Sequence, residues 1–295
     1  MKKEGSTASM LWLDIRRGFC SKRFWGIVGV VTIVFVVFLT LDIIYPLQKY
    51  YNGYGTFDWK LDSISMAPFA VRIGILSMDL FVTFFPFFGV IAYAGTIIDE
   101  RKDGYCYQII QKRGFHSYYW SHFVASGLLG GLLAVAILIS LYLLTDAIQV
   151  YLTPEFGSEN ETVYFGIHIL TKSAGHVELV LLGMVSFFLT GCLFGLLGAI
   201  IAFVSDARVL VYAMPMIIME TGCGGLYAIS LLFGRDSVAA NVLAYFYNIT
   251  GAYISFGNLL SRCIVIFLII LMLCIGKGME SKVVRYYLGE EIRQV

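Results

Sequence analysis

The sequence predicts an all-α integral membrane protein with six transmembrane helices and both termini in the cytoplasm. Its 295 residues are 59% hydrophobic and only 14% charged, and the mean hydropathy is +0.80. Soluble proteins carry about 25% charged residues, so this chain lacks the polar surface of a water-soluble globule. The net charge of +1 argues against nucleic acid as a partner, because nucleic-acid-binding proteins concentrate basic residues on one face.

Six apolar runs are long enough to cross a bilayer, whose core of about 30 Å needs roughly 20 helical residues. They cover about 24–44, 76–98, 123–144, 179–204, 209–233 and 259–275. Only residues 205–208 separate the fourth and fifth runs, which predicts a tight turn. The longest connections, 45–75 and 145–178, are too short to bury a core of their own. We therefore expect residues 1–295 to form a single transmembrane domain that ends in a cytoplasmic tail, 276–295.

The distribution of Lys and Arg predicts the orientation. Fifteen of them lie in the N-terminal segment, between the second and third runs, in the tight turn and in the tail, whereas five lie in the other connections. Cytoplasmic segments of membrane proteins carry the excess of Lys and Arg. Both termini are therefore predicted to be cytoplasmic, in a multi-pass protein of the cell membrane.

Residues 8–23, before the first run, are predicted to form an amphipathic helix. One face holds Leu11, Trp12, Ile15 and Phe19, and another holds Asp14, Arg17 and Ser21. A helix that separates a Trp and other apolar residues from basic residues lies in the membrane interface. The alternative is a solvated leader that frays.

The segment 99–121, between the second and third runs, is expected to contain two short helical stretches that are separated at Gly114. The first has an apolar stripe of Tyr105, Ile109 and Ile110 opposite a polar stripe of Gln108, Gln111 and Lys112. An amphipathic element on the cytoplasmic side is where a soluble partner could push on a membrane domain. The alternative is an ordinary interfacial loop.

The stretch between the fifth and sixth runs, 237–256, is apolar. Both of its ends lie on the outer side in the predicted topology, so it cannot cross the membrane once. We therefore expect re-entrant helices there, which dip into the membrane and return.

Three charged residues inside the predicted spans are candidates for a substrate pathway, because a charge within a bilayer is costly. They are Glu220, Asp79 and Arg262. Glu220 lies 11 residues into the fifth run, about 16 Å of helix from its inner end and so near the midplane. It could line a polar pathway, pair with Arg262, or stay protonated as a buried hydrogen-bond donor. Asp79 and Arg262 lie near the outer ends of their spans, where a charge is less costly.

Glycines predict where helices pack closely. Gly127/Gly131 and Gly191/Gly195 are two small-xxx-small pairs, a pattern that lets helix backbones approach each other. A further cluster, Gly222, Gly224 and Gly225, follows Glu220. This cluster either packs against another helix or loosens the fifth span for movement.

The sequence carries none of the enzyme motifs that we considered. There is no G-x-x-x-x-G-K-[ST] loop for ATP phosphates, and there is no H-E-x-x-H or G-x-S-x-G. His168 and the pair His176 and Glu178 would make a hydrolase only if all three converged on a metal ion. We expect no catalytic residue, no metal site and no cofactor bound by this chain.

These features together resemble the type-2 ABC exporter permease family. Its members have six spans with both ends inside, an amphipathic elbow helix, a coupling helix between spans two and three, and re-entrant helices between spans five and six. Glu100-x-x-x-Gly104 resembles the E-x-x-x-G that opens the family's coupling region. The chain departs from the family at Tyr105, where Thr is common, and in lacking a Pro nearby. His116 and His122 stand near two positions that are basic in the family.

The resemblance implies the membrane-spanning permease subunit of a bacterial ABC exporter. Two permeases, identical or homologous, would form a dimer around a central pathway, and two copies of a separate ATPase subunit would bind ATP and Mg beneath them. The residues that couple to the ATPase would be Glu100, Gly104, Tyr105, Ile109, Ile110 and Arg113. Family substrates include peptides, lipids, polysaccharides and drugs. The short outer loops favour a peptide, an antimicrobial or a drug-like molecule.

Three other functions fit the sequence. An ion-coupled secondary transporter would use Glu220 or Asp79 and need no ATPase, although one midplane acid without an internal repeat is a small coupling apparatus. A membrane-embedded hydrolase would need His168, His176 and Glu178 around a metal ion. A sensor or scaffold would bind an ATPase and move nothing.

Overall fold

The computed structural model describes residues 7–34, 37, 88–152, 176–233, 237–247 and 256–275. These residues form helices and the turns between them, and no strand occurs among them. The predicted connection 45–75, the first half of the second run, Asp79, His168 and the tail 276–295 lie outside them. The predicted all-α class is therefore confirmed for the part of the chain that the structure describes.

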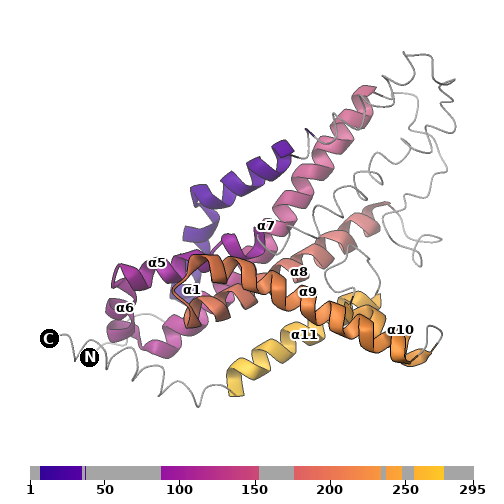
Figure 1. Ribbon diagram of the computed structural model, residues 1–295. Helices are drawn as coiled ribbons and strands as arrows, with labels where there is room; N and C mark the ends of the chain where they lie inside the picture. The colour runs from indigo at the N-terminus through magenta and orange to yellow at the C-terminus, as the bar shows by residue number, and fades with distance from the viewer. Residues whose placement is uncertain are drawn as a thin grey trace, which may run out of the picture.

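The helices carry the labels of Figure 1. They are α1 (Thr7–Phe19), α5 (Ala94–Lys102), α6 (Tyr105–Arg113), α7 (Phe115–Leu152), α8 (His176–Val204), α9 (Arg208–Leu232), α10 (Val238–Tyr247) and α11 (Phe256–Ile275). A further helical stretch, 22–34, follows α1 after a bend at Cys20 and Ser21. α1 corresponds to the predicted amphipathic helix, and α6 matches the first of the two short stretches expected in 99–121.

Three of the described helices are long and apolar enough to cross a membrane. Their apolar parts are Phe115–Ser140 in α7, Met184–Val204 in α8 and Arg208–Leu232, which is all of α9. The apolar part of α11, Leu259–Leu271, is shorter. This is the helical pattern of a membrane protein, and the three long helices coincide with predicted spans three, four and five. The six-span topology, the side of the termini and the re-entrant helices stay predictions.

The segment after Gly114 is the beginning of α7 and not the separate short helix that the sequence analysis expected. α7 continues for 38 residues, which is about 57 Å of helix. Residues 115–126 contain no glycine or proline, so no residue in this stretch stops the helix before it enters the apolar run. Gly114 adopts φ 86° at the end of α6, a backbone conformation that favours glycine.

α7 and α8 cross at the centre of the described fold, and glycine lets their backbones meet. A Cβ on Gly191 of α8 would overlap the carbonyl oxygen of Gly130 of α7. One turn further along α8, the Gly195 carbonyl accepts a hydrogen bond of 2.8 Å from the Ser126 hydroxyl. The two predicted pairs, Gly127/Gly131 and Gly191/Gly195, both lie at this crossing. The predicted close packing is therefore confirmed for both pairs.

The hydrophobic core surrounds this crossing and extends to the shorter helices. Its fully buried side chains include Phe24 of the stretch 22–34, Ile97 of α5, Leu129 of α7, Phe194 of α8 and Val211 of α9. α5 and α6 lie beside the first turns of α7 at one end of the molecule (Figure 1). The charged segment between the second and third predicted spans is thus built onto the core.

α9 contacts α10, α8 and α5, but most of its surface is open. Val211 and Pro215 near its start are buried, whereas Glu220 is exposed. A Cβ on Gly222, Gly224 or Gly225 would meet no atom within 4 Å. Within the described part of the chain, these three glycines therefore pack against no other helix.

The α7–α8 crossing can be tested with a single methyl group. Gly191→Ala is expected to destabilise the protein by about 1–3 kcal/mol, because its Cβ overlaps the facing backbone and the core must shift. The melting temperature of the purified protein in detergent measures this loss. Gly224→Ala makes the same change on open α9, where Ala is favoured over Gly, so its melting temperature should not fall. Equal losses in the two variants would contradict the crossing.

Candidate functional site

Three consecutive charged residues in the last turn of α5 connect most of the described helices. Asp99, Glu100 and Arg101, which we call the charged triplet, each reach different helices. α5 ends at Lys102, and Gly104 then takes φ 70° as the residue before α6. This turn places the triplet between the spans and α6, within the predicted coupling region.

Asp99 links the beginnings of two helices that are distant in sequence. Both terminal nitrogens of Arg23 donate to Asp99 Oδ2 at 3.3 Å. Arg208, the first residue of α9, donates to Asp99 Oδ1. One carboxylate therefore joins the stretch 22–34 and α9 to α5.

Glu100 is 7% exposed and contacts three side chains from α1 and α7. Its Oε1 accepts a hydrogen bond of 2.8 Å from Arg17 Nη1 of α1. Its Oε2 lies 3.0 Å from His122 Nε2 and accepts a hydrogen bond of 3.4 Å from the Tyr118 hydroxyl. Arg17 compensates the buried carboxylate in part, because it is an opposite charge at hydrogen-bond distance.

His122 is fully buried and lies between Glu100 and Asp14. Its Nδ1 is 2.8 Å from the Tyr93 hydroxyl and 3.7 Å from Asp14 Oδ2. A neutral imidazole protonated on Nε2 can accept from Tyr93 at Nδ1, whereas a charged imidazolium attracts both carboxylates. Asp14, Glu100 and His122, which we call the buried acid–histidine cluster, thus join α1, α5 and α7.

Asp14 faces the protein rather than the solvent, although α1 is amphipathic. It is 3% exposed and lies in line with buried Met10 and Gly18, one helical turn away on either side. Burial raises the pKa of Asp14 and the nearby Glu100 carboxylate raises it further, while His122 acts in the opposite direction. The face of α1 that packs on the protein carries Met10, Asp14 and Gly18, and Leu11 and Ile15 are partly buried beside it. The exposed side chains on its apolar side include Trp12, Leu13 and Phe19.

Arg101 binds the C-terminal end of α8. Its Nη2 donates to the carbonyls of Ala202 at 2.5 Å and Ser205 at 2.8 Å, and its Nη1 donates to that of Phe203 at 3.2 Å. It also pairs with Asp206 at 3.0 Å. The last carbonyls of a helix have no partner within the helix, and they carry its negative dipole end. Arg101 supplies the missing donors and the positive charge.

α6 packs one face on the membrane helices and leaves the other open. Cys106 is 3% exposed and forms a small apolar cluster with Met10 and Tyr118. Ile109 and Ile110, which are partly buried, pack against this cluster. Tyr105 was expected in this inner stripe but is 41% exposed. The inner face follows the spacing 106, 109, 110 and 113, which is one helix face. The predicted polar residues Gln108, Gln111 and Lys112 are exposed.

The predicted coupling residues gather at one end of the molecule, and the predicted pathway residues do not join them. Glu220 lies exposed on α9, whereas Arg262 is 1% exposed and donates a hydrogen bond to Ser186. No ion pair joins Glu220 to Arg262 in the described residues. Asp79 and the possible metal ligand His168 lie outside these residues. No group of three His, Cys, Asp or Glu side chains that could hold a metal ion occurs among them.

Of the residues that hold this site together, Glu100 was among the predicted site residues, whereas Asp14, Asp99, Arg101 and His122 were not. Asp14 was assigned only to a polar helix face, and His122 only to a position near a basic residue of the family. The sequence patterns that could have indicated Asp14 and His122 were weak. Asp14 is four residues from Met10 and from Gly18, and His122 immediately precedes an apolar run. No known family model, curated protein or solved structure matches this chain.

Arg101→Gln is expected to destabilise the protein by about 2 kcal/mol, because hydrogen bonds from a buried charged group contribute more than neutral ones. The loss should appear in the melting temperature and as faster amide hydrogen exchange in the last turn of α8. Lys102→Gln removes a charge from the neighbouring exposed residue and should leave both unchanged. An unaltered α8 terminus in Arg101→Gln would contradict the role of Arg101.

Asp14→Asn is expected to change how stability depends on pH. A carboxyl group with a raised pKa in the folded state binds its proton more tightly when folded, so its stabilisation is complete below its unfolded pKa. That stabilisation is lost as pH rises through the folded pKa. The charged or titratable groups near Asp14 are His122, Glu100, Tyr93 and Arg17. Melting temperatures from pH 4 to 8 should therefore fall less steeply in Asp14→Asn than in the wild type, and identical slopes would contradict a raised pKa of Asp14 in the folded protein.

Proposed function

We propose that this chain is the permease subunit of an ATP-driven ABC exporter, with its ATPase on a separate chain. The observation that carries the proposal is α6. This nine-residue helix lies between Gly104 and Gly114, and its inner face packs on the membrane helices. Its outer face presents the exposed Gln108, Gln111 and Lys112, and the partly exposed Tyr105 lies beside Arg17 of α1. A helix held in this way is suited to transmit force from a soluble partner to the spans.

The charged triplet supplies the transmission in this proposal. When ATPase subunits close on ATP and Mg, they would displace α6 and, through the turn at Gly104, the end of α5. Asp99, Glu100 and Arg101 would then move α9, α1 and α8, to which they are hydrogen bonded. An alternation between inward-facing and outward-facing states requires this kind of joint helix movement.

The open face of α9 favours a second permease, identical or homologous, as a dimer partner. Glu220 is exposed on this face, and a carboxylate in the middle of a span is costly when it faces lipid. A partner across a polar central pathway would remove that contact with lipid. We propose that Glu220 lines this pathway, with the exposed cluster of Gly222, Gly224 and Gly225 beside it.

The proposed complex is a bacterial cell-membrane exporter with six spans in each permease and both termini cytoplasmic. The permease itself would hold no catalytic residue, and ATP and Mg would bind only to the partner ATPase. A peptide, an antimicrobial or a drug-like molecule is the substrate class we propose. The lipid bilayer surrounds the complex, and nucleic acid has no part in it.

Affinity purification from the native host tests the role of α6. The tagged wild-type chain, extracted in a mild detergent, should bring a stoichiometric chain that carries an ATP phosphate-binding loop. Making the open face negative with Gln111→Glu, which adds a negative charge, and Lys112→Glu, which reverses a positive one, should remove that chain without changing membrane insertion or the melting temperature. Ile109→Asp is a poorer choice, because Ile109 packs partly inside the protein.

Arg16→Glu is the matched control, since it reverses an exposed charge on α1 away from α6. It should retain the ATPase. If the α6 variant also retains the ATPase, the docking assignment is wrong. If no ATPase accompanies the wild type even after chemical cross-linking in the membrane, the ABC assignment fails, and an ion-coupled transporter that uses Glu220 becomes the better hypothesis.

A further inference from the structure

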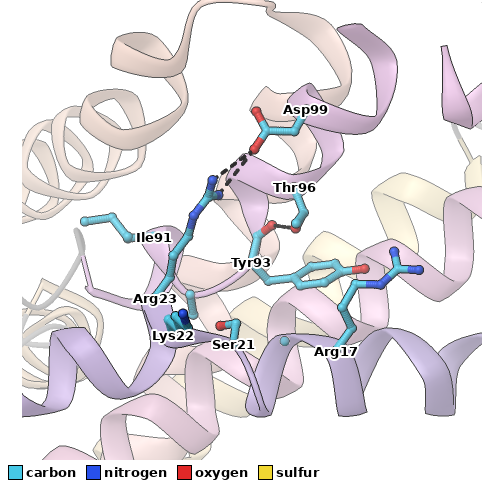
Figure 2. A pocket seen from close by; sticks show the side chains of 10 residues that line it. Arg17, Ser21, Lys22, Arg23, Ile91, Tyr93, Thr96 and Asp99 are labelled. Carbon is cyan, nitrogen blue, oxygen red and sulfur yellow. Dashed lines mark hydrogen bonds and ion pairs between the residues drawn. The ribbon is translucent and has the colours of Figure 1, made fainter. Parts of the chain in front are cut away.

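A basic cavity lies at the bend between α1 and the stretch 22–34. Its volume is about 280 Å³, far more than the roughly 15 Å³ that one water molecule needs. Residues 17, 18 and 21–23 line one side, and Ile91, Ala92, Tyr93, Thr96 and Asp99 line the other (Figure 2). The cavity adjoins α6 through Arg17, whose guanidinium lies 5.9 Å from the centre of the Tyr105 ring, but no residue of α6 lines it.

The charges around this cavity do not balance. Arg17, Lys22 and Arg23 are cations, and Asp99 is the one carboxylate in the lining. Asp99 is already engaged by Arg23 and by Arg208, as the dashed lines to Arg23 in Figure 2 show. Lys22 forms no ion pair with any residue that the structure describes. The lining therefore retains positive charge that a ligand anion can neutralise.

Polar groups suited to an anion surround the same space. Ser21 is the residue before the stretch 22–34, and its hydroxyl accepts a hydrogen bond of 3.1 Å from the Phe24 amide. The first amides of a helix have no partner within the helix, and they favour anions. Thr96 also lines the cavity, but its hydroxyl donates to the Tyr93 carbonyl, so Ser21 carries the lining hydroxyl whose proton can reach an anion. Together with the three cations, these groups suit a phosphate group.

The surroundings of the bend favour a lipid phosphate over a soluble one. Phe19 and Trp25 flank the bend, with ring centroids 5.4 Å apart, and Trp25 is 51% exposed. Exposed aromatic side chains of this kind lie at the headgroup level of a membrane. Basic pockets between membrane helices on the cytoplasmic side bind anionic headgroups.

We propose that this cavity binds the phosphate headgroup of an anionic phospholipid. Arg17, Lys22 and Arg23 would surround the phosphate, with the acyl chains along the exposed aromatic side chains of the bend. Arg17 and Arg23 are also hydrogen bonded to Glu100 and Asp99, so the lipid would strengthen the junction of α1 with α5. This inference requires that the helices lie in a membrane, but it does not require an ATPase partner.

Lipid binding to the full-length protein tests the site. Native mass spectrometry in detergent would compare phosphatidylglycerol with phosphatidylcholine of the same acyl chains. Lys22→Ala should weaken phosphatidylglycerol binding about fivefold, the loss expected for one basic residue at an anionic lipid surface, and should leave phosphatidylcholine binding unchanged. Lys22→Arg, which keeps the charge, should bind as the wild type does. Lys22 is exposed, so these changes should not disturb folding.

Arg16→Ala is the matched control, because it removes an exposed charge from α1 outside the cavity. Equal losses in Arg16→Ala and Lys22→Ala would show general surface attraction and overturn the site. No preference of the wild type for phosphatidylglycerol would also overturn it. Inorganic phosphate supplies the last arm of the test. If it binds in a Lys22-dependent way as tightly as phosphatidylglycerol does, the cavity is a site for soluble phosphate and the lipid assignment is wrong.

Discussion

The described fold depends on the charged triplet at the end of α5. Asp99, Glu100 and Arg101 are adjacent in sequence, yet their hydrogen bonds reach the stretch 22–34, α9, α1, α7 and the end of α8. Apolar packing alone is non-directional, and helices that meet through it alone can slide or rotate. Hydrogen bonds between charged groups fix geometry more narrowly. The triplet therefore determines how the shorter helices sit on the α7–α8 core.

Burying these charges costs free energy, and the structure offsets this cost differently for Glu100 and for Arg101. Glu100 and His122 lie inside the protein, where an unpaired charge is strongly unfavourable. Arg17 remains half exposed, at 51% of its side chain, while it pairs with Glu100, so only one partner loses most of its water. Arg101 instead donates hydrogen bonds to backbone carbonyls at the end of α8 that have no donor within the helix. The stability of such a site is sensitive to the loss of a single partner. This sensitivity is compatible with the proposed coupling of helix movements.

Much of the fold could be predicted from the sequence, because hydropathy and glycine act locally. The long apolar helices, the short helix between Gly104 and Gly114, and the close approach at Gly191 all follow from neighbouring residues. The buried acid–histidine cluster could not, since Asp14, Glu100 and His122 meet only after three helices pack. This dependence on contacts between helices also explains why Tyr105 is exposed although the sequence predicted it in the apolar stripe. Helical spacing allowed either Tyr105 or Cys106 beside Ile109 and Ile110, and contact with Met10 of α1 and Tyr118 of α7 decides for Cys106.

If the charged triplet determines how the shorter helices sit on the core, Glu100 makes α1, α6 and the start of α7 respond as one unit. Amide hydrogen exchange of Glu100→Gln against the wild type tests it most directly, with Asp103→Asn, an exposed acid at the end of α5, as the control. We expect faster exchange in α1, in α6 and at residues 115–122 together, with α10 and α11 unchanged and the control like the wild type. Faster exchange confined to α5 would contradict it.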